Sequence, residues 1–145
     1  MLEYRPFRPE HLNYIQPQAV QRLQQVGMLD PQYAEVLAQG VSLSAWEGHR
    51  CIAAAGIVVI RPYRSAMAWA LLSRHAGPHM LSITRRCRQV IAQDRTPRIE
   101  MSVNADFEQG RRWALAVGMQ LETPTPLRKR GANGEDEVIY ARVLP

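Results

Sequence analysis

The chain has 145 residues, of which 46% are hydrophobic, and it carries a net charge of +5 at pH 7. This length and apolar content suit a buried core, so we expect a single domain over residues 1–145. The longest apolar run, residues 51–60, is too short to span a bilayer, which argues against a membrane protein. Cys51 and Cys87 lack paired spacing and predict small buried side chains in a reducing compartment. We therefore expect a soluble cytoplasmic protein without a membrane partner.

Arginine carries almost all of the positive charge, because Lys129 is the only lysine. The arginines form three clusters, at residues 85–88, 111–112 and 128–130. One interpretation is a solvated helix face and a hairpin tip. Another is that some of these arginines meet a polyanionic ligand, because guanidinium groups match phosphate geometry. Nucleic acid is a weaker expectation, since the clusters lack interleaved aromatic residues and no nucleic-acid-binding motif is present.

The first half of the chain predicts a helix among several strands. Asp30 and Pro31 are typical of a helix start, and Gly40 is typical of its end. Short turns separate the three strands that follow, which predicts an antiparallel meander. The expected elements are a strand at 2–5, a short helix at 9–14, a Gln-rich segment at 16–29 that is open between helix and loop, and strands at 41–47, 50–60 and 65–72.

The second half alternates helices with strands. Apolar residues at helical spacing predict a helix that begins at Pro78 and runs to about Gln93. A second helix is expected after Asn104 and Asp106, which would cap it, and Gly118 would end it. Strands are expected at 98–103, 120–127 and 137–143.

The last two strands form a hairpin with Asn133-Gly134 in its turn. The helix from Pro78 connects the strand at 65–72 to the strand at 98–103, and such a crossover makes the two strands parallel. The predicted fold class is therefore an α/β mixed sheet of six or seven strands, mostly antiparallel, with helices on both faces.

The turn after the strand at 65–72 suggests a ligand site. Gly77 allows the backbone to approach a ligand closely, and Pro78 suits the first helical position. The N–H groups of the first helical turn and the helix dipole form an anion site, most naturally for a phosphate. A Gly-Pro helix start is also a common structural solution, so the residues alone leave both interpretations open.

The order of these elements and two motifs resemble the GNAT-type acyltransferase superfamily. The family's turn Arg/Gln-x-x-Gly-x-Gly/Ala is similar to Arg74-His-Ala-Gly77-Pro-His79. Its last helix is similar to the stretch with Gly110, Trp113 and Gly118-Met119. More narrowly, the pattern Ala-Trp-Ala-Leu-Leu-Ser, Gly-x-His-Met and Phe-Glu-x-Gly-x-Arg-Trp resembles small GNAT-like proteins of bacteriophages and prophages. The resemblance covers about residues 41–143.

The resemblance implies acetyl-CoA, or another acyl-CoA, as cosubstrate and no metal. The pantetheine arm would enter between the strands at 65–72 and 98–103, which splay apart in the family, and would pair with the strand backbone. The backbone N–H groups of Gly77, His79 and Met80 would bind the diphosphate, with Arg74 as a charged partner. The implied cofactor-binding residues are Ala70, Leu71, Leu72, Arg74, Gly77, His79, Met80, Gly110 and Trp113.

The resemblance also implies an N-acetyltransferase, in which an amine attacks the thioester within a ternary complex. The chain has Ala114 where many relatives carry a tyrosine that protonates the leaving thiolate. Glu100 is a candidate general base, and the alternative is a carboxylate paired with an arginine. Ser73 is a candidate donor to the thioester, and the alternative is a serine that stabilises its own turn.

The missing tyrosine keeps a second function open, that of a phage protein with a structural or binding role and weak or no acetyl transfer. The acceptor amine, whether a small molecule or a protein, is not identified by these residues. Exposed strand edges in the C-terminal hairpin make a homodimer an expectation. His75 and His79 lie four residues apart, but His75 precedes the helix, so no metal site is expected.

Overall fold

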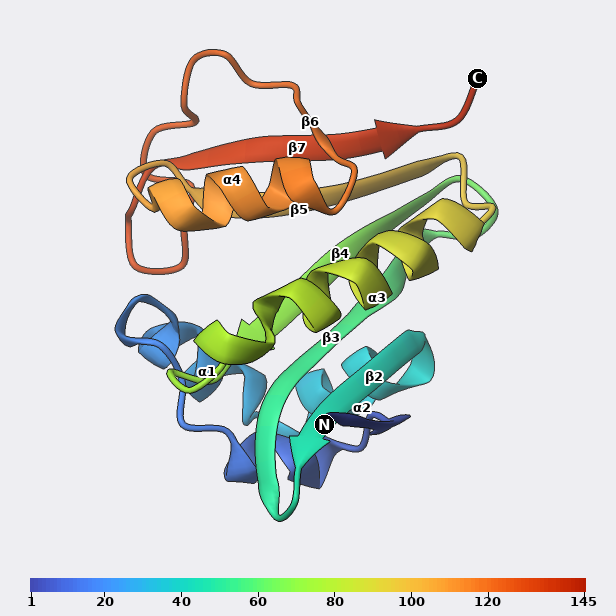
Figure 1. Ribbon diagram of the computed structural model, residues 1–145. Coiled ribbons are helices and arrows are strands. Elements are labelled where there is room, and N and C mark those ends of the chain that lie inside the picture. The colour runs from blue at the N-terminus through green and yellow to red at the C-terminus, as the bar shows by residue number, and fades with distance from the viewer. The chain divides into compact units, whose positions relative to one another are not determined.

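The computed structural model describes residues 1–145, apart from the side chains of Leu23 and Val26. Seven strands form one mixed sheet in the order β1-β2-β3-β4-β5-β7-β6 (Figure 1). The strands are β1 (Glu3–Pro6), β2 (Val41–Glu47), β3 (Arg50–Arg61), β4 (Ser65–Leu72), β5 (Arg98–Asn104), β6 (Gln120–Leu121) and β7 (Glu137–Val143). The α-helices are α1 (Arg22–Met28), α2 (Pro31–Gln39), α3 (Met80–Gln93) and α4 (Glu108–Ala116), and the 3-10 helices are η1 (Pro9–Tyr14), η2 (Ala19–Gln21) and η3 (Gly77–His79).

This topology confirms the predicted mixed sheet. β2 and β3 pair antiparallel, as the meander requires, and β5 and β7 also pair antiparallel. β4 and β5 are parallel, with Ser65–Met67 paired to Arg98–Glu100. The splaying of these two strands beyond that pairing stays a prediction. The chain forms two compact units, Met1–Val58 with Ala68–Ile83, and Val59–Met67 with Thr84–Pro145.

Local signals explain helix α2 in the first unit. The Asp30 carboxylate accepts hydrogen bonds from the backbone N–H groups of Gln32 and Tyr33, at 2.9 and 3.3 Å, so it caps the helix as predicted. The helix ends at Gly40, where a Cβ would lie only 1.9 Å from the carbonyl oxygen of Ile57. Glycine at this position is therefore required by the close approach of β3.

Helices lie on both faces of the sheet in the first unit. The Arg5 guanidinium lies 4.6 Å from the ring centre of Trp46, and Trp46 in turn contacts His11 of η1. Tyr4 points to the opposite face, as strand alternation requires, and its hydroxyl lies 2.9 Å from the hydroxyl of Ser82 in α3. The core of this unit contains Phe7, Leu12, Ile15, Met28, Ala34, Leu37, Trp46, Cys51, Ala54, Trp69 and Leu71.

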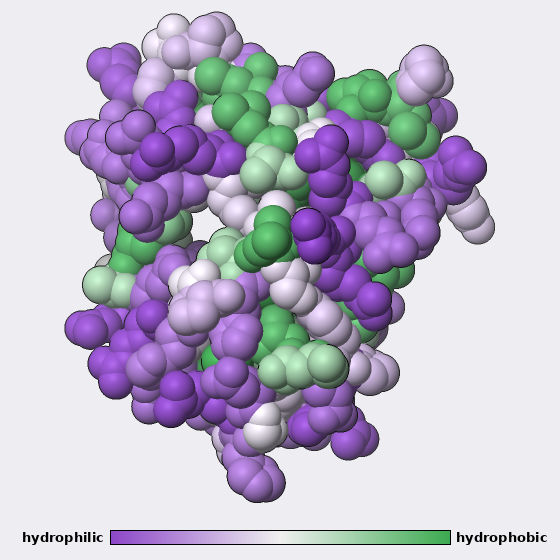
Figure 2. Space-filling view, viewed as in Figure 1, coloured by the Kyte–Doolittle hydropathy of each residue, from purple (hydrophilic) through white to green (hydrophobic). Residues whose placement is uncertain are grey.

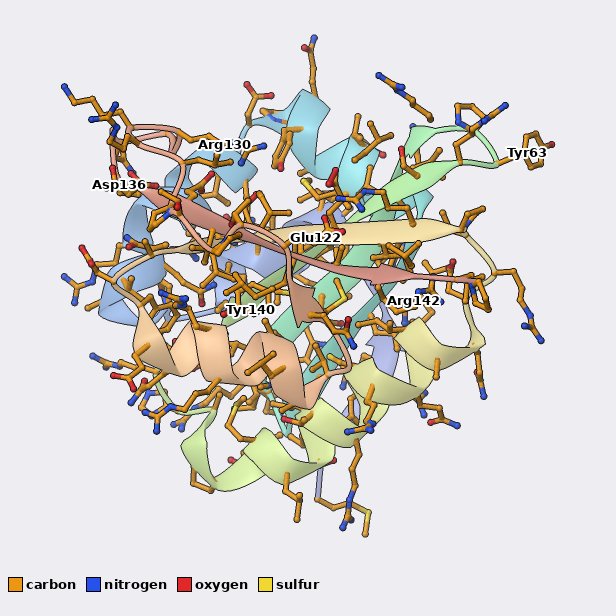
Figure 3. The ribbon with its side chains drawn as sticks, turned by 90° about the horizontal axis from the view of Figure 1, so that it is seen from above. Tyr63, Glu122, Arg130, Asp136, Tyr140 and Arg142 are labelled. Atoms are coloured by element: carbon orange, nitrogen blue, oxygen red, sulfur yellow. The ribbon has the colours of Figure 1, made fainter. Side chains whose placement is uncertain are left out.

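In the second unit, α4 packs on β5, and it lies in front of β5 and β7 in Figure 1. Tyr140 and Arg142 project from β7 on the side of the sheet where this helix lies (Figure 3). The Arg142 guanidinium donates to the carbonyl oxygens of Ile91, Asp94 and Thr96, and so fixes the end of α3 to the sheet. The surface is mostly hydrophilic on the face shown in Figure 2, with apolar residues in small patches.

Several element ends differ from the sequence-based expectation, most clearly the start of α3 and the N-cap of α4. One 3-10 turn, Gly77–His79, precedes α3, so the α-helix begins at Met80 and not at Pro78. Phe107, without a side-chain bond, occupies the N-cap of α4, and the Asn104 side chain instead accepts from the N–H of Asp106. The predicted capping by Asn104 and Asp106 was therefore wrong.

The predicted strand at 120–127 was also wrong in length, because β6 ends at Leu121. Pro124 and Pro126 follow it, and proline cannot donate a hydrogen bond to a strand ladder. A single bridge between Leu127 and Glu137 resumes the pairing. Gly134 has φ +79°, in agreement with the predicted turn at Asn133-Gly134. No helix among the described residues is long and apolar enough to cross a membrane.

Candidate functional site

The turn after β4 is fixed by its own backbone and by Ser73. The Ser73 N–H donates to the carbonyl of Ile52 in β3 at 2.8 Å, and the Ser73 carbonyl accepts from Ala76 at 3.0 Å. The Ser73 hydroxyl is buried and accepts from the N–H of His75 at 3.0 Å. This is the turn-stabilising role that the sequence left open. A direct part for Ser73 in chemistry stays a prediction.

The start of α3 presents one open position and two occupied ones. Gly77 is exposed, and a Cβ added there would meet nothing within 4 Å. By contrast, the N–H of His79 donates to Ala76 at 2.8 Å, and the N–H of Met80 donates to Gly77. Two of the three amides predicted to bind a diphosphate therefore already have partners within the turn. Pro78 has no N–H to offer.

Side chains around this turn carry both signs of charge. Arg74 is exposed, and its Nε lies 3.3 Å from Nε2 of His75. Nε2 of His79 lies 2.9 Å from the Glu47 carboxylate at the end of β2. The His79 side chain is therefore paired with a carboxylate, and Arg74 places an exposed cation at the turn.

The edge of β4 that points away from β3 is occupied by the segment before and within α1. Because Ser73 faces β3, its neighbours Leu72 and Arg74 present their backbone groups to the other edge. The Leu72 carbonyl accepts from the N–H of Gln18 at 3.1 Å, and the Arg74 N–H donates to the carbonyl of Gln16 at 2.8 Å. This segment thus adds a short antiparallel bridge, Pro17 to Ser73, to the end of β4.

Two glutamine side chains continue this pairing toward the middle of β4. The Leu72 N–H donates to Oε1 of Gln21 at 2.9 Å. The Ala70 carbonyl accepts from Nε2 of Gln21 at 3.0 Å and from Nε2 of Gln24 at 2.8 Å. The family resemblance implies that the backbone of Ala70 and Leu72 pairs with pantetheine, and in this structure glutamine side chains of the chain itself occupy these groups. Leu71, between them, is fully buried in the core.

On β5, Glu100 is paired with an arginine. The Arg98 guanidinium donates to the Glu100 carboxylate at 2.9 Å and also hydrogen-bonds Glu122. The bonds to Glu122 and then to Glu100 raise the pKa of Arg98, and the bonds from Arg98 lower the pKa of Glu122. Glu122 is labelled in Figure 3. This is the paired-carboxylate alternative for Glu100, and its role as a general base stays a prediction.

A second polar group lies further along β5 and β7. Nη1 of Arg130 donates to the hydroxyl of Ser102 at 3.2 Å and to the Glu137 carboxylate at 2.7 Å. Arg130 and Asp136 both belong to the connection between β6 and β7 (Figure 3), and the Asp136 carboxylate accepts from the N–H of Lys129 at 2.9 Å. This arginine therefore has an internal role in anchoring the connection.

In and beside α4, the predicted residues contact the protein interior. A Cβ at Gly110 would lie 2.5 Å from the ring of Phe107 and 3.1 Å from the side chain of Val103, so a larger residue would force these side chains to shift. The Trp113 indole N–H donates to the Thr84 hydroxyl at 2.9 Å and ties α4 to α3. Ala114 is fully buried and offers no acid for a leaving group.

Neither metal ligands nor reactive thiols gather in the part of the chain that the structure describes. No group of three or more His, Cys, Asp or Glu side chains is arranged to bind a metal ion among these residues. Burial raises the pKa of the Cys51 thiol to about 12 and that of Cys87 to about 11, so both thiols are protonated at neutral pH.

Comparisons with known proteins agree with this architecture at the level of the fold. No protein-family model matches the chain, and no curated protein sequence matches it. Among solved structures, Ard1 from Thermoplasma volcanium matches with a TM-score of 0.72 at 10% identity, over 99% of this chain and 98% of that one. An acetyltransferase of the GNAT family from Bacillus anthracis matches with a TM-score of 0.66 at 10% identity, over 98% and 94%.

A third match is yncA from Salmonella typhimurium, solved with its cofactor acetyl-CoA. Its TM-score is 0.68 at 9% identity, and the match covers 99% of this chain and 94% of that one. The chain therefore has the fold of the GNAT acetyltransferases, as the sequence predicted. At these identities the likeness establishes the fold, and the activity of this chain has to be argued from its own residues.

Proposed function

We propose that this chain binds an acyl-CoA and transfers its acyl group to an amine. The observation that carries the proposal is the match of nearly the whole chain to GNAT-fold structures, one of them solved with acetyl-CoA. Exposed Gly77 and Arg74 at the start of α3 support it, because an open glycine, a helix N-terminus and a guanidinium suit a diphosphate.

Residues of this chain would bind the two ends of the cosubstrate. The Gly77 N–H, which has no hydrogen-bond partner among the described residues, and the Arg74 guanidinium would contact the diphosphate. The backbone of Ala70 and Leu72 would pair with the amides of the pantetheine arm, once the glutamine side chains that now occupy those groups have moved. An extended chain that adds to a strand edge in this way gains affinity from backbone hydrogen bonds.

The reaction is a direct acyl transfer. The amine nitrogen attacks the thioester carbon, the carbon–sulfur bond breaks, and CoA leaves as a thiolate. The amine proton passes to a base and the thiolate takes a proton from an acid. Because Ala114 supplies no acid and Glu100 is already paired with Arg98, we expect solvent water to serve in at least one of these roles. We therefore expect slow transfer compared with an enzyme that has a positioned acid.

Calorimetry with acetyl-CoA tests the binding step, and release of free thiol in the presence of a panel of primary amines tests transfer. Binding together with amine-dependent thiol release is the expected result. The absence of any acetyl-CoA binding would overturn the proposal. Arg74→Ala removes an exposed guanidinium whose one hydrogen bond among the described residues is to its neighbour His75, so it should weaken binding and leave the fold intact.

A second function, a binding or structural role without turnover, is favoured by one specific observation. The position that holds a thiolate-protonating tyrosine in many GNAT proteins is a fully buried alanine, Ala114, in this chain. A component of a phage particle, or of a complex with a host protein, would fit such a role. Acetyl-CoA binding without thiol release would favour it over the enzyme.

The cysteines support a cytoplasmic location for either function. Cys51 and Cys87 are both free, as is usual for cysteines in a reducing compartment. Localisation of a tagged chain in its native cell would test this.

A further inference from the structure

The Gln21 side chain makes the two hydrogen bonds that a peptide group makes on the edge of a strand. Its Nε2 donates to the carbonyl of Ala70 at 3.0 Å, and its Oε1 accepts from the N–H of Leu72 at 2.9 Å. Gln24, one turn further along, donates to the same Ala70 carbonyl at 2.8 Å, and its Oε1 accepts from Gln21 at 3.2 Å. We call this pair of side chains, Gln21 and Gln24, the glutamine latch.

The latch is separate from the contacts that dock α1. Gln25 donates to the carbonyls of Leu12 and Ile15, at 3.0 and 2.9 Å, and Met28 at the end of the helix is buried in the core. The latch side chains are less enclosed, since Gln21 is half-buried and Gln24 is exposed. Both can therefore leave β4 by side-chain rotation, while Gln25 and Met28 keep the helix in place.

The latch bonds are also the kind that a ligand can replace at little cost. They join neutral amides to a neutral backbone, and exchanging one such hydrogen bond for another changes the free energy little. Leaving the Ala70 carbonyl and the Leu72 N–H bare would instead cost a full desolvation penalty each. A ligand that displaces the latch must therefore bring an amide of its own, with one donor and one acceptor spaced as in a peptide group.

We propose that the glutamine latch is an internal stand-in for the amide of an extended ligand, and that it must open before such a ligand pairs with Ala70 and Leu72. This inference rests on the proposed function, which supplies pantetheine as an amide-bearing ligand. The closed latch competes with that ligand for the same backbone groups. Apparent affinity is then reduced by the fraction of molecules in which the latch is closed.

The test compares a double variant, Gln21→Ala with Gln24→Ala, with the wild type and with Gln25→Ala. Gln25→Ala is the matched control, because it removes a glutamine side chain of α1 whose hydrogen bonds go to Leu12 and Ile15 and not to β4, while buried Met28 still anchors the helix. The probes are acetyl-CoA and free pantetheine, which carries the amides but no diphosphate. We expect the double variant to bind both probes more tightly, on the order of tenfold, because two or three competing hydrogen bonds are gone. We expect Gln25→Ala to bind them as the wild type does.

Hydrogen exchange of the Leu72 amide gives a second measurement that needs no ligand. In the wild type the latch protects this N–H, so the double variant should exchange it faster, and acetyl-CoA should restore the protection. Unchanged Leu72 exchange in the double variant would overturn the latch.

Unchanged or weaker probe binding in the double variant, beside a wild type that binds acetyl-CoA, would overturn the latch and leave the proposed function standing. If neither protein bound acetyl-CoA or pantetheine, the proposed function and the latch would both be overturned.

Discussion

Two regions of the molecule satisfy their polar groups with different side chains. In the first unit, glutamine side chains bond the edge of β4, through Gln21 and Gln24, and dock α1, through Gln25. In the second unit, arginines do this work: Arg142 bonds three carbonyls at the end of α3, and Arg98 bridges two carboxylates. The hydrogen-bonding side chains are neutral glutamine amides in the first unit and charged arginine guanidinium groups in the second.

This difference indicates where a ligand can enter. A neutral hydrogen bond contributes about 0.5–1.5 kcal/mol net, whereas one to a charged group contributes about 1.5–3 kcal/mol. A ligand amide can therefore replace a glutamine on β4, but no neutral ligand replaces the arginine bonds around β5 and β7. On the proposed function we therefore expect ligand exchange in the glutamine-bonded region, called here the exchangeable region, and we call the arginine-bonded region the scaffold.

The largest effect is expected in the scaffold. Arg142→Met removes the donor to the carbonyls of Ile91, Asp94 and Thr96, at 3.1, 3.0 and 2.6 Å, while keeping an apolar stem of similar length. Unsatisfied carbonyls at a half-buried site should lower the free energy of unfolding by about 2–4 kcal/mol. Urea denaturation followed by circular dichroism measures this.

Arg112→Met is the matched control for that variant. Arg112 is exposed on α4, and we expect its substitution to change stability by less than about 0.5 kcal/mol. Equal losses in the two variants would contradict the structural role of Arg142 and weaken the contrast between the two regions.

The next effect concerns ligand binding in the exchangeable region. Gly77→Ala adds a methyl group that meets nothing within 4 Å in the unliganded chain, so the thermal midpoint should stay the same. A diphosphate close to the Gly77 N–H would be pushed away by that methyl group, and we expect acetyl-CoA affinity to fall about tenfold or more. Calorimetry and a thermal melt on the same sample separate the two quantities. Unchanged affinity would place the diphosphate elsewhere.

Local signals let the sequence predict most of the fold. Asp30 and Pro31 begin a helix by capping and by a preset φ, and these devices act within three residues of each other. The strands of the meander follow from apolar runs between short turns, and the parallel strand follows from the helical crossover. The prediction for β6 was too long because Pro124 and Pro126 cannot donate hydrogen bonds to a strand ladder, and both prolines are present in the sequence.

The sequence could not predict that glutamine side chains occupy the edge of β4. Gln21 and Gln24 meet Ala70, which lies 49 and 46 residues away in the chain. A carboxamide can pair with any free strand edge, and glutamine spacing in 16–29 carries no period that points to a partner. The Gln-rich composition of that segment was the one available signal. The motif at Arg74–Gly77 located the turn. Only the structure shows that N–H groups such as that of His79 already donate within the turn.

A smaller effect is expected in the pH dependence of the unfolding free energy, through the ion pair between Arg98 and Glu122. Hydrogen bonds from Arg98 lower the pKa of Glu122 below its ordinary value of 4.5. The stabilisation of the folded state by this ion pair is therefore fully present above the pKa that Glu122 has in the unfolded chain. It is lost as the pH falls through the lower pKa that Glu122 has in the folded chain. Because Glu122 is more than a third exposed, solvent screening keeps the contribution below about 1 kcal/mol.

Glu122→Gln provides the measurement for this pair. The difference in unfolding free energy between wild type and variant should be constant near neutral pH and shrink as the pH falls below 4.5. A difference that grows on acidification would have the wrong sign for a carboxylate stabilised by Arg98.

The smallest effect is on thiol labelling, because we expect both regions to protect their cysteine while the chain is folded. Burial raises the pKa of Cys51 in the glutamine-bonded unit to about 12 and that of Cys87 in the arginine-bonded unit to about 11. At pH 8 only about one Cys87 thiol in a thousand, and about one Cys51 thiol in ten thousand, is then ionised and reactive. We expect iodoacetamide to label both slowly in the native protein, Cys87 ahead of Cys51, and both quickly in urea, as measured by mass spectrometry. Rapid native labelling of Cys51 would show that the first unit opens as a whole, and that its exchangeability is not confined to the edge of β4.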